Sequence, residues 1–299
     1  MQRLGFIGLG RMGRWMATNL IGAGFPLTVC DLDAGAVTPL VDLGAAGAAT
    51  PAEVSLRADT IFLSLPHKEA VEAVLVDDGG ILATARPGLV VVDCGTTDYL
   101  WTTELAARLA DQGVRFVDAP VTGTDLRARD ATLTIMFGGP PDLLKMLQPA
   151  LEAMGERIVH MGAVGSGQLA KLVNQLLYNT NLAALAEVLP MAVKLGLDPE
   201  KIGAVINSGT GRSFASESFI PHILEDEFTH AYSLENAYKD MAGGLGISAA
   251  HRIPLPVVQA ATTTYQTALR SGLGDEDKGA MIKPFERLLG VRFRKQKPE

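Results

Sequence analysis

The chain opens with LGFIGLGRMG at residues 4–13, and this stretch decides the fold of the first half. Gly8, Gly10 and Gly13 form the pattern G-x-G-x-x-G between a short apolar run and a helical pattern over residues 14–20. In such a turn the first glycine permits the bend, the second lets the backbone approach a pyrophosphate, and the third lets helix and strand pack closely. Free amides at the helix N-terminus then face the phosphates. The stretch therefore predicts a dinucleotide-binding turn.

An acidic residue stands where such a turn needs one. Asp31 follows the second apolar run, residues 27–30. A carboxylate there accepts a hydrogen bond from the ribose 2′-OH and repels a 2′-phosphate, which an arginine would accommodate. Because Leu32 comes next, we expect NAD as the cofactor, with NADP as the alternative. An ordinary turn residue without a ligand is the other interpretation of Asp31.

The rest of the first half alternates short apolar runs with helical patterns. The runs are residues 5–9, 27–30, 61–65, 90–93, 115–117 and 133–137. This alternation predicts an α/β fold with a Rossmann-type, doubly wound parallel sheet. From residue 168 to 195 the apolar positions recur at three and four without a glycine, which predicts one long helix. It joins a Rossmann domain, residues 1–164, to an all-helical substrate and dimerisation domain, residues 165–299.

Composition and charge narrow the class of protein. The 299 residues are 47% hydrophobic and carry a net charge of -7, which is ordinary globular composition and excludes a disordered or fibrous chain. An acidic surface fits nucleic acid poorly. Four basic residues near the C-terminus are interpreted as a solvated tail: Arg292, Arg294, Lys295 and Lys297. The five histidines lack ligand spacing, so no metal site is expected.

Cysteine usage and hydropathy suggest a compartment. Cys30 and Cys94 are too few for a disulfide framework, so free thiols in a reducing environment are expected. The apolar start is too short for a signal peptide, and we expect no apolar run near the ~20 residues that span a bilayer. These features predict a cytoplasmic protein without a membrane partner.

A second glycine-rich turn opens the long helix. The sequence GAVGSGQ occupies residues 162–168, and Lys171 and Asn174 follow on one helix face. The junction of two domains is a favoured place for small substrates, where a lysine can act as general acid and base. Spacing alone favours the alternative, a surface lysine.

Four motifs, in order and over essentially the whole chain, resemble the β-hydroxyacid dehydrogenase family, which includes 3-hydroxyisobutyrate dehydrogenases and tartronate semialdehyde reductases. The opening residues 5–13 and 16–20 resemble that family's start. DAPVTG at residues 118–123 resembles its substrate signature, residues 162–174 resemble its G-x-x-G-x-G-x-x-x-K-x-x-N signature, and Lys239-Asp240 resembles its C-terminal pair.

The resemblance implies roles for particular residues. Lys171 is the expected catalytic lysine and Asn174 orients the substrate, while Thr122 and Gly123 hold its carboxylate. The expected cofactor-binding residues are Gly8, Leu9, Gly10, Arg11, Met12, Gly13, Asp31, Leu65, Pro66, Thr96 and Lys239. Among them, Thr96 is expected to contact the nicotinamide end. The implied reaction moves hydride between NAD(P) and a small β-hydroxyacid or its semialdehyde, in a homodimer or homotetramer.

The sequence departs from the family pattern around the substrate signature. Thr122 replaces the usual serine but keeps a hydroxyl, whereas Thr124 and Ala131 stand where glycine is usual. Arg127 and Arg129 either meet a second anionic group or belong to a solvated charged loop, which the composition favours.

Two other functions remain as alternatives. One is an imine or other carbonyl reductase on the same fold, and the other is a catalytically inactive cofactor-binding protein. Lys171 argues against the reductase, and Lys171, Asn174 and the glycines argue against the inactive protein.

Overall fold

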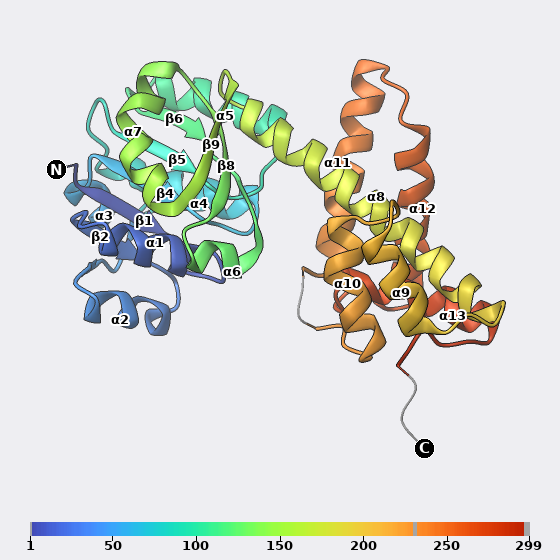
Figure 1. Ribbon diagram of the computed structural model, residues 1–299. Helices are drawn as coiled ribbons and strands as arrows, with labels where there is room; N and C mark the ends of the chain where they lie inside the picture. The colour runs from blue at the N-terminus through green and yellow to red at the C-terminus, as the bar shows by residue number, and fades with distance from the viewer. Residues whose placement is uncertain (1, 230–231, 296–299) are drawn as a thin grey trace. The chain divides into compact units, whose positions relative to one another are not determined.

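The computed structural model describes residues 2–229 and 232–295, and the chain divides into two compact units, residues 1–171 and 172–299. The first is here called the Rossmann unit and the second the helical unit. The sequence placed a boundary after residue 164, and that division stays a prediction. The helix α8 (Ser166–Lys194) belongs to both units (Figure 1).

A nine-stranded sheet forms the centre of the Rossmann unit. Its order is β3-β2-β1-β4-β5-β6-β8-β7, with β9 paired to β8. The strands are β1 (Leu4–Ile7), β2 (Leu27–Cys30), β3 (Ala46–Gly47), β4 (Thr60–Leu63), β5 (Val90–Asp93), β6 (Arg115–Asp118), β7 (Val121–Thr122), β8 (Leu133–Gly138) and β9 (Gly155–Gly162). The first six run parallel in the order 3-2-1-4-5-6 that dinucleotide-binding sheets use. The predicted Rossmann-type sheet is therefore confirmed.

Helices cover both faces of this sheet because its strands are buried on both sides. The helices are α1 (Gly13–Gly22), α2 (Ala34–Asp42), α3 (Pro51–Arg57), α4 (Lys68–Val76), α5 (Tyr99–Ala110), α6 (Thr124–Arg129) and α7 (Pro141–Met154). Alternate strand residues join different cores: Phe6 packs in the core with α1 and α7, and Ile7 packs in the core with α3, α4 and α5. A doubly wound sheet needs this division of apolar side chains between two faces.

The far edge of the sheet differs from the predicted all-parallel pattern. Strand β8 runs antiparallel to β6 and β7, and parallel to β9. No strand was predicted at β9, because its residues GERIVHMG neither alternate nor form an apolar run. An edge strand is hydrogen-bonded on one side only and tolerates this composition.

The helical unit is built around the later turns of α8. Its other helices are α9 (Pro199–Ser208), α10 (Phe214–Leu224), α11 (Leu234–His251), α12 (Pro256–Arg270) and α13 (Ile282–Leu289), with a short 3₁₀ helix at Lys278–Met281. Leu182 and Leu189 of α8 pack in one core with Phe219 and Tyr265. The predicted C-terminal helical domain and long helix are confirmed.

The apolar character of α8 corrects one expectation. By length and composition alone, α8 could cross a membrane, so an apolar run of that size is present. Leu182, Leu185 and Leu189 are nevertheless buried within the helical unit, as in the core helix of a globular domain.

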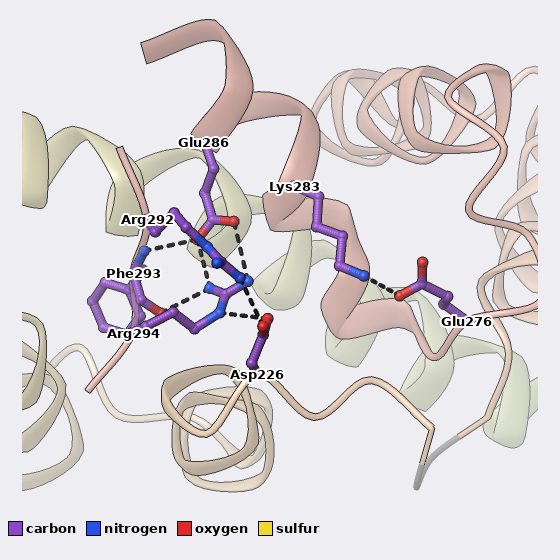
Figure 2. Close-up of polar contacts among 7 residues, drawn as sticks. All are labelled: Asp226, Glu276, Lys283, Glu286, Arg292, Phe293 and Arg294. Atoms are coloured by element: carbon purple, nitrogen blue, oxygen red, sulfur yellow. Dashed lines mark hydrogen bonds and ion pairs between the residues drawn. The ribbon is translucent and has the colours of Figure 1, made fainter. Parts of the chain in front are cut away.

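Ion pairs attach the C-terminal segment, residues 292–295, to the rest of the helical unit (Figure 2). Arg294 binds both oxygens of Glu286, at 2.6 and 3.2 Å, and its Nε donates to Asp226 at 2.7 Å. The side chains of Arg294 and Glu286 are only 12% and 6% exposed. The interpretation of this segment as a solvated tail is therefore wrong for Arg294, whereas Lys297 lies outside the described residues.

Candidate active site

The glycine turn has a different geometry at each of its three glycines. Gly8 has φ +93°, which a side chain rarely adopts. A Cβ on Gly13 would lie 1.9 Å from the Gly8 carbonyl oxygen, so only glycine lets α1 pack there. A Cβ on Gly10 would meet nothing within 4 Å. The turn therefore leaves open space at Gly10, where a pyrophosphate is expected to approach, and it fits the cofactor.

Asp31 lies directly beside this turn. Its carboxylate accepts from the Leu9 N–H at 2.6 Å and from the Asp33 N–H at 2.9 Å. Asp31 thus connects the end of β2 to the glycine turn, and the neighbouring Leu32 is fully exposed. The role of this carboxylate toward a ribose stays a prediction.

The other expected cofactor residues of the Rossmann unit follow its parallel strands. Leu65 and Pro66 come after β4 and Thr96 comes after β5, at the same carboxyl edge of the sheet as the glycine turn after β1. Leu65 and Thr96 are half-buried and Pro66 is exposed. Exposed Arg11 lies 3.8 Å from the Asp125 carboxylate. Met12 is half-buried and precedes α1. These residues line one edge, as ligand binding to an open α/β sheet requires.

Two buried carboxylates at this edge were missed from the sequence. Asp93 ends β5 and accepts from the Gly95 N–H at 2.9 Å and the Thr97 hydroxyl at 3.0 Å. Asp118 ends β6 and accepts from the N–H groups of Gly165 at 2.6 Å and Gln168 at 2.8 Å. Burial raises the pKa of each carboxyl to about 6, although these hydrogen bonds lower it. Each follows or ends a predicted apolar run, and Asp118 also opens the substrate signature at residues 118–123, but neither was given a role.

The substrate signature forms a strained loop. Thr122 lies at the end of β7 and Gly123 has φ +142°. Thr124 and Ala131, the two positions where the family usually has glycine, have φ +64° and +55°. A β-branched residue in the left-handed region costs on the order of 1–3 kcal/mol, so the loop departs from the family pattern at an energetic cost.

Two arginines that follow the substrate signature, Arg127 and Arg129 of α6, take part in ion pairs. Arg127 lies 3.5 Å from Glu156, and Arg129 lies 2.9 Å from its neighbour Asp130. Both arginine side chains are about half exposed, 46% and 54%. These contacts support a solvated charged surface rather than a second anion site, although Arg127 and Arg129 lie on the helix α6 and not on a loop.

Lys171 is held against the substrate signature. Its Nζ donates to the Val121 carbonyl oxygen at 2.8 Å, and Val121 directly precedes Thr122. The lysine is half-buried, one turn into α8. Lys171 and Thr122 are therefore brought to one place within the Rossmann unit, which the spacing alone could not decide.

Asn174 and Lys239 belong to the helical unit. Asn174 is exposed on α8, one turn after Lys171, and the next residue, Gln175, donates to Asp240 at 3.0 Å. Lys239 is exposed on α11 and donates to Asn236 at 3.4 Å. Their expected roles toward substrate and cofactor stay predictions.

A buried lysine in the helical unit was also missed. Lys278 is 2% exposed, donates to Asn179 Oδ1 at 2.8 Å, and lies 3.8 Å above the Tyr178 ring. Amide and aromatic contacts of this kind stabilise a buried ammonium.

Among residues 2–229 and 232–295, no three His, Cys, Asp or Glu side chains are grouped to hold a metal ion.

Comparisons with known proteins agree with this geometry. The NAD-binding domain of 6-phosphogluconate dehydrogenase matches residues 3–162, and the NAD-binding domain of NADP-dependent 3-hydroxyisobutyrate dehydrogenase matches residues 165–285. The 2-(hydroxymethyl)glutarate dehydrogenase of Eubacterium barkeri is 37% identical over 97% of this chain and 96% of its own length.

Two solved structures are similar over nearly the whole chain. The 3-hydroxyisobutyrate dehydrogenase of Salmonella typhimurium has a TM-score of 0.88 at 28% identity, covering 95% of this chain and 100% of its own. Psf3 in complex with NADP⁺ and 2-OPP has a TM-score of 0.82 at 27% identity, covering 94% and 99%.

The glycine turn, the strand order and these matches define an NAD(P)-binding oxidoreductase. The relatives from Eubacterium barkeri and Salmonella typhimurium are, by their names, hydroxyacid dehydrogenases. The chain belongs to the β-hydroxyacid dehydrogenase family.

Proposed function

We propose that this oxidoreductase transfers hydride between NAD(P) and a small β-hydroxyacid or its semialdehyde, with Lys171 as the general acid and base. The observation that carries the proposal is the contact of Lys171 Nζ with Val121 O, at 2.8 Å. It places the ammonium next to Thr122 and Gly123, the segment expected to hold the substrate. A general acid or base must lie within hydrogen-bond reach of the proton that it moves.

The chemistry of the chain follows from this placement. In oxidation, the neutral Lys171 amine takes the proton of the β-hydroxyl while hydride leaves the carbon that bears it. In reduction, the ammonium returns that proton to the forming alkoxide. The nicotinamide, when bound, supplies or accepts the hydride at its C4.

A carboxylate on the substrate is expected to bind at Thr122 and Gly123. The hydroxyl of Thr122 and the backbone amides of the loop are suited to an anion, and charge-assisted hydrogen bonds are the strong ones. The two relatives act, by their names, on 2-(hydroxymethyl)glutarate and 3-hydroxyisobutyrate, both acids with a hydroxyl at the β position. These names support a short acid of that type as the substrate.

Three further properties are part of the proposal. NAD is preferred over NADP because Asp31 lies beside the glycine turn and Leu32 carries no charge. The protein works in the cytoplasm, where its free, buried cysteines Cys30 and Cys94 stay reduced. It assembles as a homodimer or homotetramer, as the resemblance implies.

Turnover by a Lys171→Met variant tests the proposal. A positioned acid or base contributes roughly 10²–10⁴-fold, so kcat is expected to fall by that factor while NADH still binds. Lys145→Met, at an exposed lysine on α7, is the matched control and should keep wild-type turnover. Near-normal turnover by Lys171→Met would reject this lysine as the catalytic group.

The substrate class is tested with a panel of acids. We expect turnover of 3-hydroxyisobutyrate, glycerate, 3-hydroxypropionate or 4-hydroxybutyrate, and much lower efficiency with their uncharged analogues, which lack the anchor that orients them. Equal efficiency on acids and alcohols would show that the loop does not bind a carboxylate. Turnover of imines alone would favour the reductase alternative, and binding of NADH without any turnover would favour the inactive one.

A further inference from the structure

The side chain of Gln168 holds the loop after β5 from both sides of Thr96. Its Oε1 accepts from the Thr97 N–H at 3.0 Å, and its Nε2 donates to the Gly95 carbonyl oxygen at 3.0 Å and to Asp93 Oδ2 at 3.5 Å. Gln168 is 1% exposed. One buried amide thus fixes both neighbours of Thr96, the residue expected at the nicotinamide end of the cofactor.

The backbone of Gln168 is fixed just as firmly. Its N–H donates to Asp118 Oδ2 at 2.8 Å, and the other oxygen of Asp118 accepts from the Gly165 N–H at 2.6 Å. A Cβ on Gly167 would lie 2.2 Å from the Met136 carbonyl oxygen, so the start of α8 lies directly on the sheet. The first turn of α8 therefore has little room to shift unless Asp118 moves with it.

Lys171 follows Gln168 by three residues, on the next turn of α8. Its Nζ contacts Val121 O, three residues after Asp118. The first turn of α8 is consequently attached twice to the segment 118–121, once through the Asp118 carboxylate and once through Lys171. A displacement at Gln168 moves the base of the Lys171 side chain relative to that segment.

We propose that Gln168 is a positioning residue that couples the loop at residues 95–97 to Lys171, so that cofactor bound at Thr96 sets the position of the acid–base group. The proposal rests on the proposed function through the roles of Lys171 and Thr96. A buried amide with satisfied partners on two elements links them more specifically than an apolar side chain would. Without this link, the cofactor still binds the glycine turn, but the lysine is less well placed.

Two variants separate this coupling from simple packing. Gln168→Met keeps the length and burial of the side chain. It removes every hydrogen bond of the side-chain amide and leaves the backbone N–H that donates to Asp118. We expect kcat to fall by about 10–100-fold, since a misplacement of about 1 Å can cost 10²-fold, while NADH affinity stays within about threefold. Gln148→Met, at an exposed glutamine on α7, is the control and should match the wild type.

Gln168→Glu adds a readout that packing alone would not move. The titratable groups around this position are Asp93 on β5, Asp118 on β6, Lys171 on α8 and, beside Gly165, Tyr99 on α5. When ionised, the introduced carboxyl repels Asp93 and cannot donate to Gly95 O; when protonated, it can. The kcat of Gln168→Glu relative to wild type should therefore rise as the pH falls from 8 to 5.5, whereas the ratio for Gln168→Met stays flat.

Amide hydrogen exchange with NADH as the probe tests the coupling without turnover. In the wild type, NADH should slow exchange both in residues 94–98 and in residues 165–171; in Gln168→Met, only the first segment should respond. A wild type that shows this coupling but turns over no hydroxyacid would reject the proposed function. The coupling of the loop at residues 95–97 to the first turn of α8 would still hold. If the wild type turns over acids, and Gln168→Met matches it in kcat and in exchange, or the Gln168→Glu ratio is flat with pH, the inference is wrong.

Discussion

Different partners satisfy the buried carboxylates of Asp93 and Asp118 in the Rossmann unit and of Glu286 in the helical unit. In the Rossmann unit, Asp93 and Asp118 accept hydrogen bonds from backbone N–H groups and neutral side chains, and burial raises their pKa values to about 6. In the helical unit, Glu286 accepts from the Phe293 N–H at 2.7 Å and is also paired with the guanidinium of Arg294. The neighbouring Asp226 is partly buried, which raises its pKa, but Arg294 and Arg292 hold that pKa below its ordinary value.

The two sets of partners have different consequences. The carboxyls of the Rossmann unit can change their protonation with pH, whereas the ion pairs of the helical unit hold the C-terminal segment in place. Neutral donors leave a buried carboxyl able to take a proton near pH 6, at the strand ends that carry the candidate site. In the helical unit, the guanidinium of Arg294 binds Glu286 of α13 and Asp226, and these ion pairs attach the C-terminal segment to both. The tryptophans Trp15 and Trp101 both lie in the Rossmann unit, so their fluorescence follows that unit alone.

The glycine turn should give the largest effects, and it tests whether ligand binding and folding can be separated. Gly13→Val places a side chain 1.9 Å from the Gly8 carbonyl oxygen, so we expect loss of the native tryptophan signal of the Rossmann unit. Gly10→Val projects into open space and should keep that signal, but lose NADH affinity by at least about tenfold because the backbone can no longer approach a pyrophosphate. Unchanged NADH binding by folded Gly10→Val would contradict the placement of the phosphates.

Arg294→Met should give the largest loss of stability in the helical unit. Removing the arginine leaves the buried Glu286 carboxylate with the Phe293 N–H but without a charged partner, which costs about 3–5 kcal/mol of unfolding free energy. Urea unfolding followed by circular dichroism measures it, and the tryptophan transition should not change. Arg292→Met is the control: that arginine side chain is 65% exposed and its pair with Asp226 contributes at most about 1 kcal/mol. Equal losses in the two variants would remove the distinction between the buried and the exposed pair.

The Rossmann unit should lose stability as the pH rises from about 4 to about 7. Asp93 and Asp118 bind protons more tightly in the folded state, so their contribution is present below the ordinary carboxyl pKa and is lost as the pH rises through about 6. The loss is on the order of 2–3 kcal/mol for each carboxyl. Tryptophan-detected urea unfolding across this range measures it. Asp93→Asn keeps an acceptor for the Gly95 N–H and should flatten the dependence; the same slope in that variant would show that other groups cause it.

The sequence predicted the parts of this molecule whose pattern is local. The glycine turn, the parallel strands β1, β2, β4, β5 and β6 and the long helix are each read from consecutive residues, and each is confirmed, whereas the two-residue strand β3 was not predicted. The edge strand β9 was missed because its residues carry no periodic signal. The buried network of Asp93, Asp118 and Gln168 was missed because it joins residues up to 75 positions apart, and only the sheet order brings them together.

The same limit applies to single residues whose environment is set by the fold. Arg294 was interpreted as part of a solvated tail, since nothing near it in the sequence announces Glu286 and Asp226 as partners. Thr124 was recognised as a departure from the family pattern, but its positive φ could not be derived from its neighbours. The spacing placed Lys171 on the right helix without deciding its contact, which depends on where Val121 lies.

Cofactor preference should show the smallest effect, and it tests whether the half-buried carboxylate of Asp31 acts by its charge. Asp31 has two duties: it accepts from the Leu9 N–H at 2.6 Å, which shapes the glycine turn, and it is expected to face the ribose. Asp31→Asn keeps an acceptor oxygen for Leu9 and removes only the charge. Because the repulsion of a 2′-phosphate disappears and a charge-assisted hydrogen bond to the 2′-OH weakens, the ratio of kcat/KM for NAD to that for NADP should fall about tenfold, or about 1.4 kcal/mol. Leu32→Arg in the same variant should lower the ratio further, because the fully exposed position 32 can place a guanidinium beside the phosphate.

Steady-state kinetics with both cofactors measures these ratios, with Asp33→Asn as the matched control. A wild type that prefers NADPH would overturn the role of Asp31, and an unchanged ratio in Asp31→Asn would leave its carboxylate with the structural duty alone.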